Sequence, residues 1–477
     1  MFKKWWVLTG VACGTFMATL DSSIVNIALP TLTREWNEPV SHVKWIVIIY
    51  LLLLTLLVLP FGRVSDLYGR KRAFLYGYLT FVTGSGLCGF APSVGFLIFF
   101  RAIQACGGAM LMANGPAVIT SAFPPQELGK ALGTLAMVVS GGLISGPALG
   151  GFVITHLGWR AIFWINVPIG ILGMYLVKRF FYKQPTPQIR LPFDSFGAFL
   201  QAFFLICFIL ALDPLGIDFH EYGSYTSQLL RVSLLLLSLI AFILFVIVEK
   251  RHEAPLVDFS LLHNRTFWTA NLAGFLTFVS FSGLSIFMPF FLENVHKYDT
   301  ETSGAFMALI PLTILFVAPV TGRLSDQYGS KGLSLLGSGA LCISFTLMAT
   351  HLSSLTSPLW ITLLLILIGF GIGAFQSPNN NAIMGRVPKK KLSTASAFLA
   401  TVRNLGMVTG TSLAAFVFHT STHSGLDFSS SIRAVLWVSA IMALGAFFAS
   451  MGKPKGPHWS KHELEKERKG THRGRSH

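Results

Sequence analysis

Two residues of opposite charge lie inside apolar segments of the chain, where ionisable side chains are rare. Asp21 belongs to the apolar run that begins near the N-terminus, and Arg101 lies in the apolar segment 95–118. An ionisable group in hydrocarbon is costly, and by default it marks a functional site. Burial favours a neutral carboxyl group whereas an arginine partner favours the carboxylate, so an acid in alternating surroundings binds and releases protons. We predict that Asp21 and Arg101 form a proton-coupling site; the alternative is a static ion pair between two helices.

A second group of charged residues occurs twice in the chain. The segment GRVSDLYGRK (62–71) recurs as GRLSDQYGSK (322–331), each time between two apolar segments. Glycines permit close backbone approach and positive φ, and acids held by helix N-termini or arginines would tie helices together until those contacts break. We predict a gating loop; the alternative is a basic loop that only sets the topology. The predicted gate residues are Gly62, Arg63, Asp66, Gly69, Arg70, Lys71, Arg323 and Asp326.

The apolar segment near 131–154 is rich in small residues and reads GTLAMVVSGGLISGPALGG from Gly133. Small residues four positions apart let helices touch backbone to backbone, and a proline frees a carbonyl and kinks the helix. So many small residues in one segment favour a hinge or a leak-tight seam between two halves of the molecule. Ordinary tight packing of helices is the alternative. The residues concerned are Gly133, Gly142, Gly146, Pro147, Gly150 and Gly151.

A third charged position, Arg403, lies in a later apolar segment with no acidic residue predicted at its depth. It either holds a negative group of a substrate or caps carbonyls near a helix break. The candidate substrate cavity comprises Asn26, Gln104, Gln376, Asn380 and Arg403.

The composition places these residues in a membrane protein. Of the 477 residues, 53% are hydrophobic and 12% charged, against roughly 25% charged in soluble domains. Runs such as 45–61 and 229–248 approach or reach the ~20 residues that a helix needs to cross a bilayer. They are continuous rather than alternating, which excludes a β-barrel. The five cysteines lie in apolar runs without paired spacing, so we expect no disulfide, metal site or cofactor.

Apolar stretches separated by glycine, proline and charge predict an all-α polytopic protein with roughly fourteen spans. Lysine and arginine gather in alternate loops and in both tails, which places both termini in the cytoplasm. The net charge of +16 therefore reflects topology, and no nucleic acid is expected as a partner. The repeat indicates two homologous halves, an organisation typical of transporters. We predict an N-terminal six-helix bundle at 1–180, a linker with two extra helices at 181–264, a C-terminal six-helix bundle at 265–452, and a basic cytoplasmic tail at 453–477.

The motifs together resemble the major facilitator superfamily, and in particular its fourteen-span drug:proton antiporter branch, the EmrB/QacA-type multidrug exporters. The segments LDSSIVNIALP (20–30) and WRAIFWINVPIG (159–170) are similar to two signatures of that branch, as are the repeated loop and the glycines of 133–151. Ala105 departs from the pattern, since the fourth-span motif usually has glycine there. The resemblance covers the chain up to about residue 450. It implies the major facilitator fold with two peripheral inserted helices, and it implies that Asp21 and Arg101 belong to the proton-coupling site.

We therefore predict a secondary transporter of a bacterial plasma or inner membrane. It would export lipophilic drugs or toxic small molecules in exchange for protons, by alternating access, and confer antibiotic resistance. Family members that export dications tend to carry several acids in their spans, and this chain has only Asp21 there, so we expect neutral or weakly anionic substrates. The predicted partners are the substrate, protons and membrane lipids, with a periplasmic adaptor where the host has an outer membrane. We expect a monomer.

Two alternatives differ from this prediction. The same fold could export one dedicated metabolite, such as a siderophore or an amino-acid derivative. An integral-membrane enzyme acting on lipids is disfavoured, because the sequence has no Gly-x-Ser-x-Gly elbow and no His-Glu-x-x-His pair. We therefore expect no enzyme. The lack of a nucleotide-binding motif also argues against an ATP-driven pump.

Overall fold

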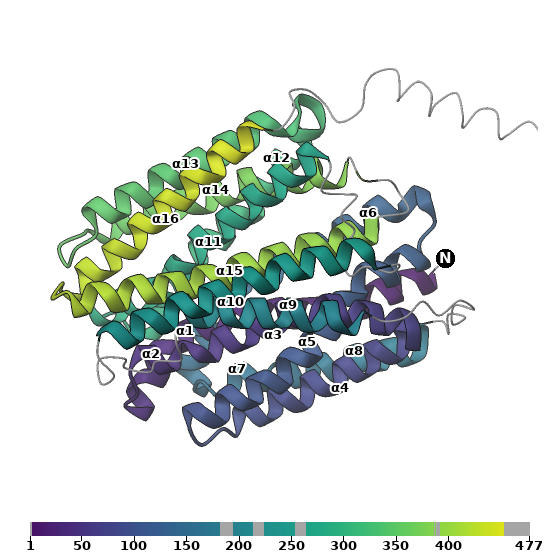
Figure 1. Cartoon of the computed structure of the whole chain (residues 1–477), viewed down its shortest axis with the longest axis horizontal. Coiled ribbons are helices and arrows are strands. Elements are labelled where there is room, and N and C mark those ends of the chain that lie inside the picture. The colour runs from purple at the N-terminus through teal and green to yellow at the C-terminus, as the bar shows by residue number, and fades with distance from the viewer. Residues whose placement is uncertain are drawn as a thin grey trace, which may run out of the picture.

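The computed structural model describes residues 2–181, 194–212, 224–252, 264–385, 387 and 392–452. Within these ranges the regular elements are sixteen helices (Figure 1). In chain order they are α1 Phe2–Trp36, α2 Val40–Val43, α3 Trp45–Tyr68, α4 Arg70–Gly89, α5 Val94–Ala122, α6 Pro125–Leu157, α7 Ala161–Trp164, α8 Asn166–Phe180, α9 Ser195–Leu212, α10 Ser224–Arg251, α11 Arg265–Asn294, α12 Thr300–Tyr328, α13 Ser330–His351, α14 Pro358–Met384, α15 Leu392–His423 and α16 Phe428–Met451.

Local sequence explains where several of these helices begin and end. Side chains that accept hydrogen bonds from the first free N–H groups precede α11, α12, α14 and α16, and they belong to Asn264, Asp299, Ser357 and Asp427. The two repeated loops end α3 and α12 at glycines with positive φ, +99° at Gly69 and +86° at Gly329. Such φ values are readily adopted only by glycine, so both copies of the repeat make the same turn.

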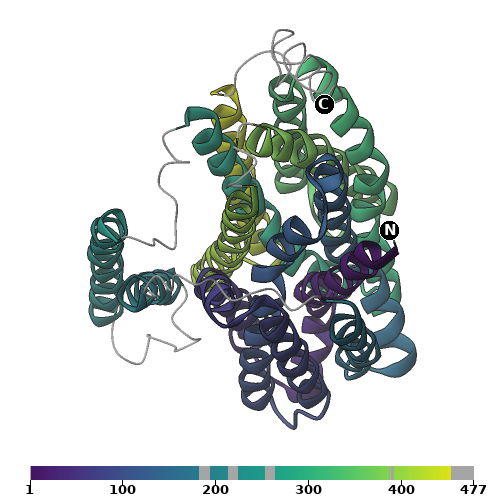
Figure 2. The same cartoon turned by 90° about the vertical axis from the view of Figure 1, so that its right-hand side faces the viewer.

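The long helices form two groups that meet along a central interface. Helices α1, α3, α4, α5, α6 and α8 pack among themselves, and α11 to α16 do the same. The groups meet where α6 packs against α12, α3 against α15, and α1 against α11. Figure 2 shows α9 and α10 as a pair beside the bundle, where α9 contacts α3 and α15. We call the end of the bundle at the start of α1 the N-terminal side, and the end that carries α2 and α7 the far side.

Burial distinguishes the central helices from those at the periphery. In the most apolar stretches of α1 and α11, 83% and 78% of the residues are buried, against 22% in α10. Helix α10 therefore presents most of its apolar side chains outward, whereas α1 and α11 are surrounded by protein. The two most central helices are the first of their respective groups.

Eleven of the described helices are long and apolar enough to cross a membrane. Helices α4, α6 and α15 run beside them in the bundle (Figure 1). Helix α4 opens with three basic residues and α15 is rich in serine and threonine. In α6 the apolar stretch among the described residues is the shorter Gly141–Leu157. The chain is thus a multi-pass, all-helical membrane protein, and the count of fourteen spans remains a prediction. The predicted tail at 453–477 and much of the predicted linker lie outside the described residues.

Candidate functional site

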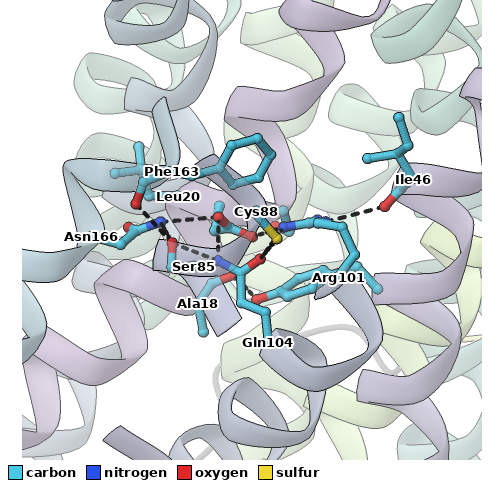
Figure 3. Close-up of polar contacts among 12 residues, drawn as sticks. Ala18, Leu20, Ile46, Ser85, Cys88, Arg101, Gln104, Phe163 and Asn166 are labelled. Carbon is cyan, nitrogen blue, oxygen red and sulfur yellow. Dashed lines mark hydrogen bonds and ion pairs between the residues drawn. The ribbon is translucent and has the colours of Figure 1, made fainter. Parts of the chain in front are cut away.

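The middle of α1 carries a carboxylate that is fully enclosed by neighbouring helices. Asp21 and Arg101 both have an exposed fraction of 0%, and Arg101 Nη1 donates a hydrogen bond to Asp21 Oδ2 within an ion pair. Figure 3 shows the polar side chains that converge there from α1, α4, α5 and α8. The structure thus brings the two predicted residues into contact, and their role in proton coupling remains a prediction.

The second carboxylate oxygen of Asp21 accepts hydrogen bonds from two amides. Gln104 Nε2 lies 2.9 Å and Asn166 Nδ2 lies 3.0 Å from Asp21 Oδ1. Both amides also donate to Ser85 Oγ, at 3.0 and 3.1 Å, and Ser85 Oγ donates to the backbone carbonyl of Phe163 at 2.7 Å. Both oxygens of the buried carboxylate therefore have donors, as an enclosed charge requires.

The guanidinium of Arg101 makes further contacts that do not involve Asp21. Its Nε donates to the carbonyl of Ile46 at 3.1 Å, and Nη1 donates to Gln104 Oε1 at 2.8 Å. Its Cζ lies 3.9 Å from the centre of the Tyr50 ring, a distance at which the ring face attracts a cation. Arg101 therefore remains held in place if Asp21 is neutralised by a proton.

Sequence reasoning missed some members of this cluster. Asn166 lies in the WINVPIG signature as a single polar residue in an apolar run, and that isolation is a signal that could have marked it. Ser85 and Tyr50 gave no such signal, because both residue types are common in membrane helices. Gln104, predicted for the substrate cavity, lies in the cluster instead, one helical turn from Arg101 on α5.

A central cavity lies between the two groups of helices. Its volume is about 710 Å³, including the part open to solvent. Of the residues predicted for a substrate cavity, Asn26 and Gln376 line it, whereas Asn380 and Arg403 are not among the lining residues. Residues from α1, α6, α11, α12, α14 and α15 line it, namely Ser23, Asn26, Leu143, Pro147, Thr277, Phe278, Phe281, Ser285, Met307, Ile310, Pro311, Ile314, Ile372, Gln376 and Met407. Every one of them is uncharged.

The small residues of α6 let it fit closely between α1 and α12. A Cβ added at Gly146 would lie 2.8 Å from the backbone nitrogen of Ile24, and one added at Gly151 would lie 2.9 Å from the Cα of Gly304. Real Cβ atoms essentially never come this close, so a side chain at either position would push the helices apart. Gly142, Gly146 and Gly150 face α1, whereas Gly151 faces α12 in the other group. Helix α6 therefore forms a seam across the interface.

Lysines of the two repeated loops bind the ends of equivalent helices. Lys71 Nζ donates to the carbonyls of Lys178 and Phe181, at 2.9 and 2.8 Å, at the end of α8. Lys331 Nζ donates to the carbonyl of Met451, at 2.5 Å, at the end of α16. Cations at helix C-termini are stabilising, and both of these contacts stay within one group of helices.

The structure describes some of the other predicted gate residues but not all of them. Arg70 Nη1 donates to the carbonyl of Ala117 at 3.0 Å, near the end of α5. Gly62 and Arg63 are partly buried and Arg323 is exposed. The side chains of Asp66 and Asp326, and the surroundings of Gly133, lie outside what the structure describes. The gating role of these loops remains a prediction.

Two polar pairs join α1 to α11 across the interface, and the sequence had not indicated them as pairs. Asn26 Nδ2 donates to Ser285 Oγ at 2.8 Å, and Arg34 Nη2 donates to Glu293 Oε2 at 2.5 Å on the far side. In both pairs the partners are 259 residues apart. Helices α1 and α11 thus meet in the same register at both pairs.

This arrangement and the sequence together identify the family. The family model described as the Major Facilitator Superfamily matches residues 11–411. The chain belongs to the major facilitator superfamily. Its members among the curated relatives are transporters, and no enzyme family is indicated by them.

Curated relatives carry the names of transporters with different substrates. The chain is 35% identical to the riboflavin transporter RibZ of Clostridioides difficile (strain 630), over 92% of this chain and 93% of that protein. It is 29% identical to multidrug resistance protein 3 of Bacillus subtilis (strain 168), over 85% and 78%. It is 28% identical to the tetracenomycin C resistance and export protein of Streptomyces glaucescens, over 86% and 75%.

Solved structures agree with the fold. A bacterial homologue of the human lysosomal transporter Spinster, in an inward-facing and unoccupied conformation, superposes with a TM-score of 0.64 at 16% identity, over 95% of this chain and 98% of that one. The human organic anion transporter MFSD10 gives a TM-score of 0.63 at 16% identity, over 94% and 99%. The superfamily and its fold are thus shown, whereas the fourteen-span antiporter branch is not.

Proposed function

We propose that this superfamily member is a proton-coupled exporter of small lipophilic molecules. The observation that carries the proposal is the position of Asp21 on α1. The helix buries this carboxylate against Arg101, and the same helix lines the central cavity with Ser23 and Asn26. Because one helix carries both the acid and part of the cavity wall, a change in the charge of Asp21 displaces residues that contact the substrate.

The surroundings of Asp21 suit a carboxyl group that changes its protonation state. When a proton neutralises Asp21, Arg101 keeps the Ile46 carbonyl, Gln104 Oε1 and the Tyr50 ring. The penalty of leaving a buried cation unpaired is therefore reduced. In the proposed cycle Asp21 binds a proton when the cavity faces outward, and it releases that proton when the cavity faces the cytoplasm. The substrate travels in the opposite direction.

The proposed orientation places the N-terminal side in the cytoplasm of a bacterial cell and the far side outside its plasma membrane. The basic loops support it through the positive-inside rule. The two groups of helices rock about the cavity, with α6 as the seam and the repeated loops as the gate. We further propose that the protein acts as a monomer, joined by a periplasmic adaptor where the host has an outer membrane.

The similarity to relatives named for multidrug resistance supports the proposal that the substrates are lipophilic molecules of several kinds. A second candidate function is transport of one dedicated metabolite, which the 35% identity to a protein named riboflavin transporter favours. The uncharged lining of the cavity suits neutral molecules in both cases, since neither an ammonium nor a carboxylate finds a counter-charge there.

The test uses bacteria that lack their own efflux pumps and express the wild type or Asp21→Asn at equal levels. Accumulation of riboflavin and of neutral lipophilic drugs is measured with and without a protonophore. We expect reduced accumulation with the wild type only, and loss of the difference when the protonophore is present. Efflux that persists without the proton gradient would contradict proton coupling.

A further inference from the structure

The polar part of the cavity wall consists of Ser23, Asn26, Thr277, Ser285 and Gln376. The rest of the wall is apolar, with phenylalanine, methionine, isoleucine, leucine and proline side chains. Ligand pockets commonly combine an apolar lining with a few polar groups that fix the orientation of the ligand. The hydrogen-bonding state of these few groups therefore determines which ligands are recognised.

Two hydroxyl groups of the wall have already donated their only proton. Ser23 Oγ donates to the carbonyl of Leu20 at 3.0 Å, and Thr277 Oγ1 donates to the carbonyl of Ala273 at 2.8 Å. A hydroxyl group has one hydrogen to donate and lone pairs that accept. Toward the cavity these two side chains therefore present only lone pairs, which are acceptors.

Asn26, which also lines the cavity, carries a further acceptor, and its side chain is held in place. Its Nδ2 donates to Ser285 Oγ at 2.8 Å, which fixes the amide between α1 and α11. The residue is 6% exposed, and among the described atoms its Oδ1 is buried without a hydrogen-bond partner. An unpaired buried carbonyl oxygen is costly, and such a group calls for a donor.

We propose that Asn26 is a specificity-determining residue, whose Oδ1 accepts a hydrogen bond from an uncharged N–H or O–H group of the substrate. This inference rests on the proposed function, in which the cavity holds the substrate. The substrate class is a neutral, largely apolar or aromatic molecule that carries at least one donor, such as an imide, lactam or hydroxyl. A substrate without that donor leaves Oδ1 unpaired and binds more weakly.

The expected discrimination follows from the energetics of one buried hydrogen bond. Leaving a buried acceptor unpaired lowers affinity by roughly tenfold. The lining residues include no carboxylate, so an ammonium ion would lose its hydration there without gaining a counter-charge. We therefore expect uncharged donors to bind better than cationic ones.

The experiment compares pairs of neutral aromatic probes that differ only in one donor. Lumiflavin, the ring system of riboflavin without its hydroxylated chain, is paired with 3-methyllumiflavin, and quinolin-2(1H)-one with its N-methyl derivative. Binding to the purified full-length protein is measured without a proton gradient. For the wild type we expect roughly tenfold tighter binding of the N–H member. In Asn26→Leu we expect a ratio near one, with the affinity for the N-methyl member unchanged.

A matched control is available on α5. Asn114 is a buried asparagine whose Nδ2 donates to the carbonyl of Met110 at 2.7 Å, and its Oδ1 also has no partner among the described atoms. It does not belong to the lining of the cavity. Asn114→Leu should therefore keep the wild-type preference for the N–H member.

Several outcomes would overturn the inference. These are equal binding of both members by the wild type, a preference that persists in Asn26→Leu, an equal loss of both members in that variant, or no binding of either pair to the wild type. None of them bears on proton coupling, because no gradient is present in the assay. Conversely, an exporter that proved independent of protons would leave the binding ratio intact.

Discussion

Asp21 accepts hydrogen bonds from two neighbouring helices, from Arg101 and Gln104 on α5 and from Asn166 on α8. Both amides also donate to Ser85 on α4. Charge-assisted hydrogen bonds of this kind are roughly twice as strong as neutral ones. The same cluster leaves Arg101 with the Ile46 carbonyl, Gln104 Oε1 and the Tyr50 ring when a proton neutralises Asp21.

Removal of one donor to Asp21 should weaken proton-coupled efflux. In Asn166→Leu, Asp21 Oδ1 retains only the bond from Gln104 Nε2. We expect efflux under a fixed pH gradient to fall by roughly tenfold, because a hydrogen bond to a charged group is worth about 1.5–3 kcal/mol and about 1.4 kcal/mol corresponds to tenfold. Asn114→Leu, which lies outside this hydrogen-bonded cluster, serves as the control, and unchanged efflux in Asn166→Leu would refute the expectation.

At this scale the sequence predicted the charged pair but not its complete environment. A lone acid and a lone arginine in apolar segments are conspicuous, because their cost in hydrocarbon demands a reason. Ser85 and Tyr50 are conspicuous only once the fold places them beside the pair. Gln104 was assigned to the cavity because sequence gives the depth of a residue in a helix more readily than the direction in which it faces.

The close packing of α6 against its neighbours depends on the absence of a Cβ atom at its glycines. Its glycines bring the backbone of α1 to one side and that of α12 to the other. At Gly146 an added Cβ would meet Ser23 Oγ at 2.0 Å and the backbone nitrogen of Ile24 at 2.8 Å. A serine side chain can rotate away, but the backbone contact is relieved only when the helices move apart.

Gly146→Leu should block transport without removing a charge. Overpacking typically costs about 1–3 kcal/mol, and here it would separate α6 from α1 at the seam. Gly141→Leu is the matched control on the same helix, since a Cβ at Gly141 would meet no described atom within 4 Å. Proteoliposome transport of both variants, with thermal unfolding as a check on folding, tests this expectation. Equal activities would show that the seam tolerates displacement.

The contact between Arg34 and Glu293 should regulate opening of the far side. The Glu293 side chain has 0% exposure in the ion pair, so Arg34→Glu leaves two like charges at the interface. We expect at least a several-fold increase in the outward-open population, measured as a longer distance between spin labels on α2 and on the loop after α15. The reversed pair, Arg34→Glu with Glu293→Arg, should restore the wild-type distances. Failure of that rescue would argue against a role of this ion pair in closing the far side.

For the elements, sequence predicted the apolar helices well because their length and continuity follow from bilayer thickness. It also predicted the close packing of α6, since the spacing of glycines on a helix determines one face. The contacts between α1 and α11 were not predicted, because nothing in the sequence indicates that these two helices pack together. The residues concerned are Asn26, Ser285, Arg34 and Glu293.

In the whole molecule, two groups of helices form a cavity between them, and it is lined in part by α1 and α11, the most buried of the eleven membrane-length helices. The recurrence of GRVSDLYGRK as GRLSDQYGSK was sufficient to predict two halves. The size and lining of the cavity could not be predicted, because they are spread over six helices and depend on how the halves tilt. The substrate is undetermined by sequence for the same reason.

The central claim is that Asp21 exchanges protons for substrate, and proteoliposomes with a lumenal pH probe test it most directly. Purified wild type and Asp21→Asn are compared under an imposed pH gradient, with lumiflavin, riboflavin and a panel of lipophilic drugs as substrates. We expect proton movement triggered by substrate in the wild type and none in Asp21→Asn, although that variant still binds the same probes. Equal proton movement in both proteins would contradict it and return Asp21 and Arg101 to a structural ion pair.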